Sequence, residues 1–88
     1  MAMMSDMITI NVHAFAAAAD AMGARQDTCS VASNATVQDV WRMLLQNAPD
    51  LSSLEDTIAF ARNDILVNRT MTLQDGDTLS LLPPVSGG

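Results

Sequence analysis

The chain has 88 residues, of which ten are acidic and four basic, giving a net charge of -6. So acidic a chain lacks the basic patch that nucleic acids require and is repelled by anionic membranes, so neither partner is expected. Hydrophobic residues make up 49% of the sequence, which favours a folded domain over a disordered chain. One cysteine excludes an intramolecular disulfide, and no apolar run reaches the ~20 residues of a membrane-spanning helix.

The first residues are not expected to act as a secretion signal, because residues 1–7 contain no basic residue and no long apolar segment. The chain is therefore predicted to be cytoplasmic. We expect residues 1–82 to form a single domain in which residues 1–6 are frayed, and residues 83–88 to form an extended tail.

The first predicted element is a strand over residues 7–15, where MITINVHAF alternates with a period of two. This alternation places Phe15 on the face away from the core. The alanine-rich run 16–22 favours a short helix or turn, and Gly23 follows where a left-handed C-cap is needed. Residues 26–32 indicate a second strand joined to the first.

The clearest helix starts after Thr36, a predicted N-cap that pairs with Asp39 in a capping box. Apolar residues then recur at helical spacing and form one stripe: Val37, Val40, Trp41, Leu44 and Leu45. Pro49 is expected to end the helix. Leu51 and Leu54 are expected to anchor the connection that crosses back over the core.

The last third of the chain is strand-like. Residues 57–62 and 65–67 are separated by the Asn-Asp pair 63–64, a plausible turn. The Asp-Gly-Asp run 75–77 is a strong turn signal before a final strand over 78–82, whose alternation sets Leu79 and Leu81 on the face opposite Ser80 and Leu82. Two carboxylates there would also suit calcium, but an EF-hand needs many more oxygen ligands, so the turn is the preferred interpretation.

The predicted order is therefore β-β-α-β-β-β. Laying the apolar stripe of the main helix across one face of a mixed sheet gives an α+β roll of the ubiquitin-like, β-grasp kind.

The sequence closes with six residues of unusual chemistry: Pro83, Pro84, Val85, Ser86, Gly87 and Gly88. The two prolines remove backbone donors, so the strand cannot continue and the tail should leave the sheet extended. Six such residues reach roughly 20 Å. A glycine pair can thread a narrow channel, and the Gly88 carboxylate has no Cβ beside it. Because the chain contains no glycine-rich nucleotide loop, a separate enzyme would have to activate that carboxylate.

The sequence LQDGDTLSLLPPVSGG, residues 73–88, resembles the C-terminal signature of MoaD-type molybdopterin synthase small subunits, sulfur carriers of the MoaD/ThiS ubiquitin-like family. A D-G-D run followed by P-P-V-[ST/A]-G-G is typical of them. The first strand with Phe15, and the position of Gly23, also match the opening of the family, so the resemblance covers about residues 8–88.

The resemblance implies that an E1-like enzyme adenylates Gly88 with MgATP and that a persulfide sulfur donor converts it to a thiocarboxylate. Two copies would flank a dimer of the large synthase subunit, forming a heterotetramer, and pass sulfur to cyclic pyranopterin monophosphate in molybdenum cofactor biosynthesis. The chain would bind no cofactor or metal and would not be an enzyme by itself, because the catalytic side chains are expected on the large subunit. The family's hydrophobic docking surface would fall on Phe15, Leu66 and Leu82.

Two alternatives remain at this point: a sulfur carrier for another pathway, such as thiazole synthesis, and a ubiquitin-like modifier or interaction module. The Pro-Pro-Val-Ser run before the glycines disfavours the thiazole carrier. Cys29 is interpreted as a small buried apolar residue instead of a nucleophile. His13 is a lone histidine that supports neither a metal site nor a catalytic dyad.

Overall fold

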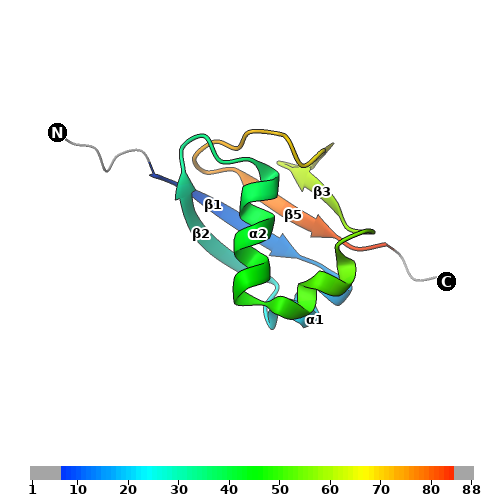
Figure 1. Ribbon diagram of the computed structural model, residues 1–88. Coiled ribbons are helices and arrows are strands. Elements are labelled where there is room, and N and C mark those ends of the chain that lie inside the picture. Colours follow the sequence, from blue (N-terminus) through cyan, green and yellow to red (C-terminus); the bar gives the residue numbers. More distant parts are fainter. Residues whose placement is uncertain (1–6, 85–88) are drawn as a thin grey trace.

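The computed structural model describes residues 7–84 (Figure 1). The elements, in chain order, are β1 (Met7–Ala14), α1 (Ala16–Met22), β2 (Gln26–Ala32), α2 (Val37–Asn47), the 3-10 helix η2 (Pro49–Leu54), β3 (Ala59–Arg62), β4 (Ile65–Val67) and β5 (Thr78–Leu82). This confirms the predicted order of five strands and one main helix. The predictions for residues 1–6 and 85–88 lie outside the described residues.

The five strands form one mixed sheet in the order β2-β1-β5-β3-β4. β1 pairs in parallel with β5, whereas β2, β3 and β4 pair antiparallel with their neighbours. Figure 1 shows α2 lying across one face of this sheet, with β5 between β1 and β3. The fold class is therefore the predicted α+β roll, and the last strand of the chain occupies its centre.

The helix α2 begins as its sequence predicts. The Thr36 hydroxyl accepts a hydrogen bond from the Asp39 amide at 3.3 Å, and the Asp39 carboxylate accepts one from the Thr36 amide at 2.9 Å. The helix ends at Asn47, just before Pro49. Neither α2 nor any other helix within residues 7–84 has the length and apolar character to cross a membrane.

The core lies between α2 and the sheet. Four of the five predicted stripe residues are buried, and Leu45 is partly buried at the edge of the stripe. The largest buried side chain is Trp41, whose ring meets Phe60 of β3 edge-on at 5.6 Å between centroids. Leu51 in η2 is fully buried and Leu54 is partly buried, which confirms that both anchor the crossing connection.

Two strands are shorter than the sequence predicted. The strand predicted over 57–62 begins at Ala59, because the amides of Thr57 and Ile58 donate to Leu54 at 3.1 and 2.9 Å and prolong the η2 turn. The strand predicted over 7–15 ends at Ala14, one residue before Phe15.

Candidate functional site at the end of the central strand

The tail leaves the sheet from its central strand. β1 and β5 run parallel, with Ala14 beside Leu81, so both strands end at the same edge of the sheet. Leu82 still pairs with Ala59 of β3, and the strand then stops. Pro83 and Pro84 follow with no backbone N–H to extend the ladder.

Pro83 is half-buried and Pro84 is exposed. The remaining predicted tail residues, Val85, Ser86, Gly87 and Gly88, lie outside the described residues, and their role stays a prediction.

The three predicted docking residues share one face of the sheet, the face turned away from α2. Leu66 lies opposite Ala61, which lies opposite Ser80, and Leu82 is two residues farther along β5 on the same side. Phe15 follows β1 with extended backbone (φ -126, ψ 149), so it continues the alternation of β1 onto that face.

The docking residues differ in exposure. Leu66 is 70% and Phe15 48% exposed, whereas Leu82 is partly buried. Between them the face carries small side chains, of which Ala61 and Ser80 are buried by the flanking strands. The result is an apolar surface next to the point where β5 ends at Leu82. That this surface binds a partner remains a prediction.

A second exposed apolar residue on β4 was not predicted from the sequence. Ile65 is 69% exposed although its side chain follows the alternation of the opposite face. β4 is a three-residue edge strand, so neither of its faces is covered. A strand of three residues is too short for its alternation to predict that Ile65 is exposed.

Ala16 bends the chain sharply after Phe15. Its φ of 49° is unusual for a residue with a Cβ, and it marks the step from β1 into α1. The Phe15 carbonyl accepts hydrogen bonds from the amides of Ala18 at 3.0 Å and Ala19 at 3.4 Å. These bonds fix the backbone that carries the Phe15 ring.

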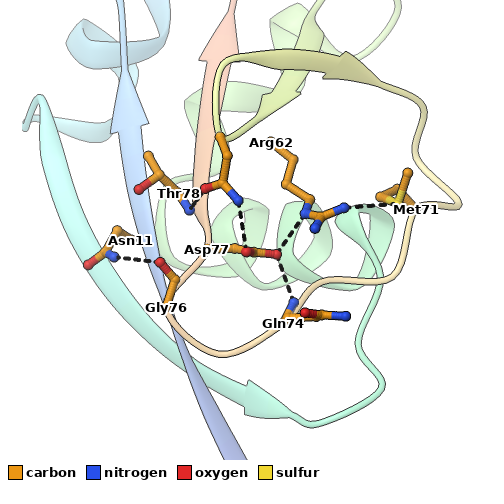
Figure 2. A network of polar contacts seen from close by, with 8 residues as sticks. Asn11, Arg62, Met71, Gln74, Gly76, Asp77 and Thr78 are labelled. Atoms are coloured by element: carbon orange, nitrogen blue, oxygen red, sulfur yellow. Dashed lines mark hydrogen bonds and ion pairs between the residues drawn. The ribbon is translucent and has the colours of Figure 1, made fainter.

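The opposite end of β5 is held by a buried carboxylate. Figure 2 shows Asp77 facing Arg62 and Gln74. One carboxylate oxygen accepts from Arg62 Nε at 2.9 Å and from the Gln74 amide at 2.8 Å, while the other accepts from Asn63 Nδ2 at 3.0 Å. Burial alone would raise the pKa of Asp77, but these donors outweigh it and hold the pKa below its ordinary value.

The start of β5 and the turn before it are tied to β1 and to the loop that follows β3. The Asn63 side-chain oxygen accepts from the Thr78 amide at 2.9 Å, and on the other side the Asn11 amide donates to the Asp77 carbonyl at 2.9 Å. Asp75 accepts from the Thr9 amide at 2.8 Å, and Gly76 has a φ of 85°. This confirms the turn interpretation of the Asp-Gly-Asp run.

A second ion pair braces the helix side of the core. The Arg69 guanidinium lies 5.7 Å from the Trp41 ring centroid and 5.3 Å from that of Phe60, and it pairs with Glu55 at 2.6 Å. The hydrogen bond from the Trp41 indole, followed by that from Arg69, lowers the pKa of Glu55. Because this pair packs on two buried aromatic rings of the core, we assign it a structural role.

Cys29 and His13 do not form a reactive centre. Burial, assisted by the negative charge of Asp27, raises the pKa of the Cys29 thiol, which favours the unreactive protonated form. His13 is partly buried on the face shared with the docking residues. Within residues 7–84, no cluster of three or more His, Cys, Asp and Glu side chains is arranged to hold a metal ion.

Comparisons with known proteins show similar chains of known family and fold. The chain is 30% identical over 88 residues to the human molybdopterin synthase sulfur carrier subunit, covering 97% of this chain and all of that protein. Among solved structures, SAMP1 of Haloferax volcanii is 32% identical with a TM-score of 0.83, covering 91% of this chain and 99% of that one.

A third match is a complex of subunits 1 and 2 of molybdopterin-converting factor from Helicobacter pylori, 30% identical with a TM-score of 0.62 over 92% of this chain and all of that one. The resemblance seen in residues 73–88 is thus confirmed over nearly the whole length. The model of the ThiS family matches residues 12–88, and the chain belongs to the ThiS family.

Proposed function

We propose that this chain is the sulfur carrier subunit of a molybdopterin synthase and that Gly88 carries the sulfur. The names of the human and Chlamydomonas reinhardtii relatives support this assignment. The structural observation that carries it is the departure of the chain from a central strand at Pro83, beside an apolar face that presents Phe15, Leu66 and Leu82. A firmly held strand that releases a proline-stiffened tail suits delivery of a terminal group to another protein's active site.

The proposed chemistry begins with an otherwise unreactive carboxylate. In an E1-like enzyme, a Gly88 oxygen attacks the α-phosphorus of MgATP, and pyrophosphate leaves. The terminal sulfur of a persulfide donor then displaces AMP from the acyl adenylate, and a thiol reduces the resulting acyl disulfide to the thiocarboxylate. Within this proposal, MgATP belongs to the activating enzyme, and this chain is the substrate being carried.

Delivery then requires docking on the large synthase subunit. The similar Helicobacter pylori protein forms a complex between subunits 1 and 2 of its molybdopterin-converting factor, which supports such a partner. In our proposal the apolar face binds the large subunit, and the tail enters its active site. There the sulfur passes to cyclic pyranopterin monophosphate, and the large subunit supplies the catalytic side chains.

Mass spectrometry of the C-terminal peptide tests the proposal. The chain is incubated with the activating enzyme, MgATP and a sulfur donor, and the same reaction without ATP serves as the control. The C-terminal peptide is measured because replacing oxygen by sulfur nearly matches the mass of a methionine oxidation, and the chain has seven methionines. An ATP-dependent thiocarboxylate on Gly88 is expected. An unmodified Gly88, with an enzyme that is active on another carrier, would refute the proposal.

A second candidate is a protein modifier. The similarity to SAMP1, which is called small archaeal modifier protein 1 in a second Haloferax volcanii structure, favours it. A modifier would form amide bonds between Gly88 and amines of other proteins, whereas the synthase subunit would restore molybdoenzyme activity in cells that lack their own carrier. A sulfur carrier for thiazole synthesis remains a third alternative, and it would restore thiamine synthesis instead.

A further inference from the structure

The outer face of the sheet has two chemically different halves. Its β5–β3–β4 half carries small and apolar side chains, as described above. Its β1–β2 half is polar, because the cross-strand pair Asn11 and Thr28 and the pair His13 and Gln26 both point outward. Phe15 follows His13 along β1 and stands at the tail-bearing edge of this polar half.

A hollow of about 350 Å³ opens beside Phe15. It lies between the end of β1, the start of α1 and the start of β2, and its polar lining comes from His13, Arg25 and Gln26. The Arg25 carbonyl accepts a hydrogen bond from the Ala14 amide at 2.8 Å, so the backbone of Arg25 is fixed next to the end of β1. Phe15 and Arg25 therefore line one hollow near the end of β1, the strand that pairs with the tail-bearing strand β5.

Arg25 differs from the two arginines already described. Arg62 and Arg69 are engaged in ion pairs, whereas Arg25 is exposed and forms no ion pair with any residue in the described range 7–84. Asp27 lines the adjoining hollow but not this one, and its carboxylate accepts a hydrogen bond from the Thr28 amide at 2.8 Å. In a chain with a net charge of -6, this hollow presents a cationic group that is available to a partner.

We propose that the hollow beside Phe15 receives an acidic side chain of the large synthase subunit, which pairs with Arg25. The inference rests on the proposed function, because it assigns chemistry to the partner that docks on this face. The apolar half of the face and Phe15 supply the buried contact area, and Arg25 fixes the orientation of the partner. The occupant is a carboxylate because, among the described residues lining the hollow, the permanently charged group is a guanidinium, which binds carboxylates through paired N–H donors.

The pair formed by Arg25 and the partner's carboxylate would lie at the edge of the apolar interface, and this position predicts how it contributes to binding. Contacts at the edge of an apolar interface contribute through orientation and association rate, and they weaken as salt screens them. Replacing Arg25 should therefore weaken binding most at low ionic strength. The apolar contacts of Phe15 should be much less sensitive to salt.

The test is calorimetric titration of the large subunit with the native chain and matched variants. Arg25→Ala should weaken binding about tenfold at low salt, and Arg25→Glu should weaken it further. Arg25→Lys, which keeps the charge, should recover part of the loss. Arg42→Ala is the control, because Arg42 is an exposed arginine on α2 and its removal changes the net charge equally. It should alter affinity less than twofold.

Salt shows whether the contribution of Arg25 is electrostatic, and the Arg42→Ala control separates the pairing from a general charge effect. The difference between Arg25→Ala and the native chain should shrink at about 0.5 M salt. Equal affinities for the Arg25→Ala and Arg42→Ala variants would overturn the inference while leaving the proposed function intact. If the native chain itself fails to bind a folded large subunit, the proposed function fails, and the assigned partner fails with it.

Discussion

The two ends of β5 are built in opposite ways. At its start, the buried Asp77 carboxylate accepts from three donors, one of them Arg62 of β3, and backbone hydrogen bonds tie the preceding turn to β1. At its end, Leu82 makes the last strand pairing, and two prolines remove any further donors. One end is fixed by directional polar contacts, and the other is released beside an apolar surface.

This difference separates stability from function along a single strand. The polar end anchors β5 in the middle of the sheet, where Leu79 and Leu81 are fully buried. Other proteins can then bind the released end without disturbing the core. We therefore expect changes at the Asp77 end to alter the free energy of unfolding, and changes at the Leu82 end to alter partner binding.

The largest effect is expected at the released end. Leu82→Asp should weaken binding to the large subunit by about 2 kcal/mol or more, because it would bury an unpaired charge in the interface. Ser33→Asp, at an exposed turn position, adds the same charge as a control. Titration calorimetry measures both affinities, and thermal unfolding checks the fold. Affinity equal to that of the control would remove Leu82 from the interface.

A smaller effect of the opposite kind is expected at the anchored end. Asp77→Asn should lower the free energy of unfolding by about 2 kcal/mol at neutral pH, because an amide cannot accept from all three donors. Once the variant is folded, its affinity for the large subunit should stay close to native. Urea unfolding measures the loss, with the exposed Asp56→Asn as the matched control. A native-like unfolding midpoint would contradict the anchoring role.

The same variant has a pH signature. The native pKa of Asp77 is lowered from an ordinary value of 3.8, so its stabilisation is fully present above that value and is lost as pH falls through the lowered native pKa. The stability difference between the native chain and Asp77→Asn should therefore be constant near neutral pH and shrink in strong acid. If the difference in the free energy of unfolding grew on acidification, the prediction would be wrong.

The smallest effect concerns the loop that supplies Asn63. Asn63 and Asp64 join β3 to β4 with φ values of 50° and 72°, and glycine is preferred at the second position of such loops. Asp64→Gly should stabilise the fold by about 0.5 kcal/mol, the relief of strain exceeding the entropic cost of glycine. Asp64→Ala removes the same charge but keeps the Cβ, so it should give no such gain in thermal unfolding.

Local signals in the sequence predicted most of the fold but not its long-range pairs. The capping box of Thr36, the apolar stripe of α2 and the turn at Gly76 depend on residues within a few positions, and all three were correctly predicted. The pairing of Arg62 with Asp77 joins positions 15 apart and depends on how β3 meets β5. No pattern within one segment encodes it.

In the candidate site, too, the local sequence predicted some features and missed those that depend on long-range packing. Alternation along β1 and β5 was enough to place Phe15 and Leu82 on the outer face, whereas Leu66 was assigned through the family resemblance. The burial of Ser80 depends on its place in a central strand. The φ of Ala16 has no sequence signal, because alanine does not favour the left-handed region.

If Gly88 carries the chemistry, its removal should stop sulfur transfer without affecting the folded core. The experiment deletes Gly88 and compares the variant with the native chain in sulfur transfer to the pterin precursor and in thermal unfolding. We predict that transfer is abolished, while the unfolding midpoint and its cooperativity stay unchanged. Transfer that persists without Gly88 would show that the sulfur is carried elsewhere, and a deletion that destabilises the fold would show that the tail belongs to the core.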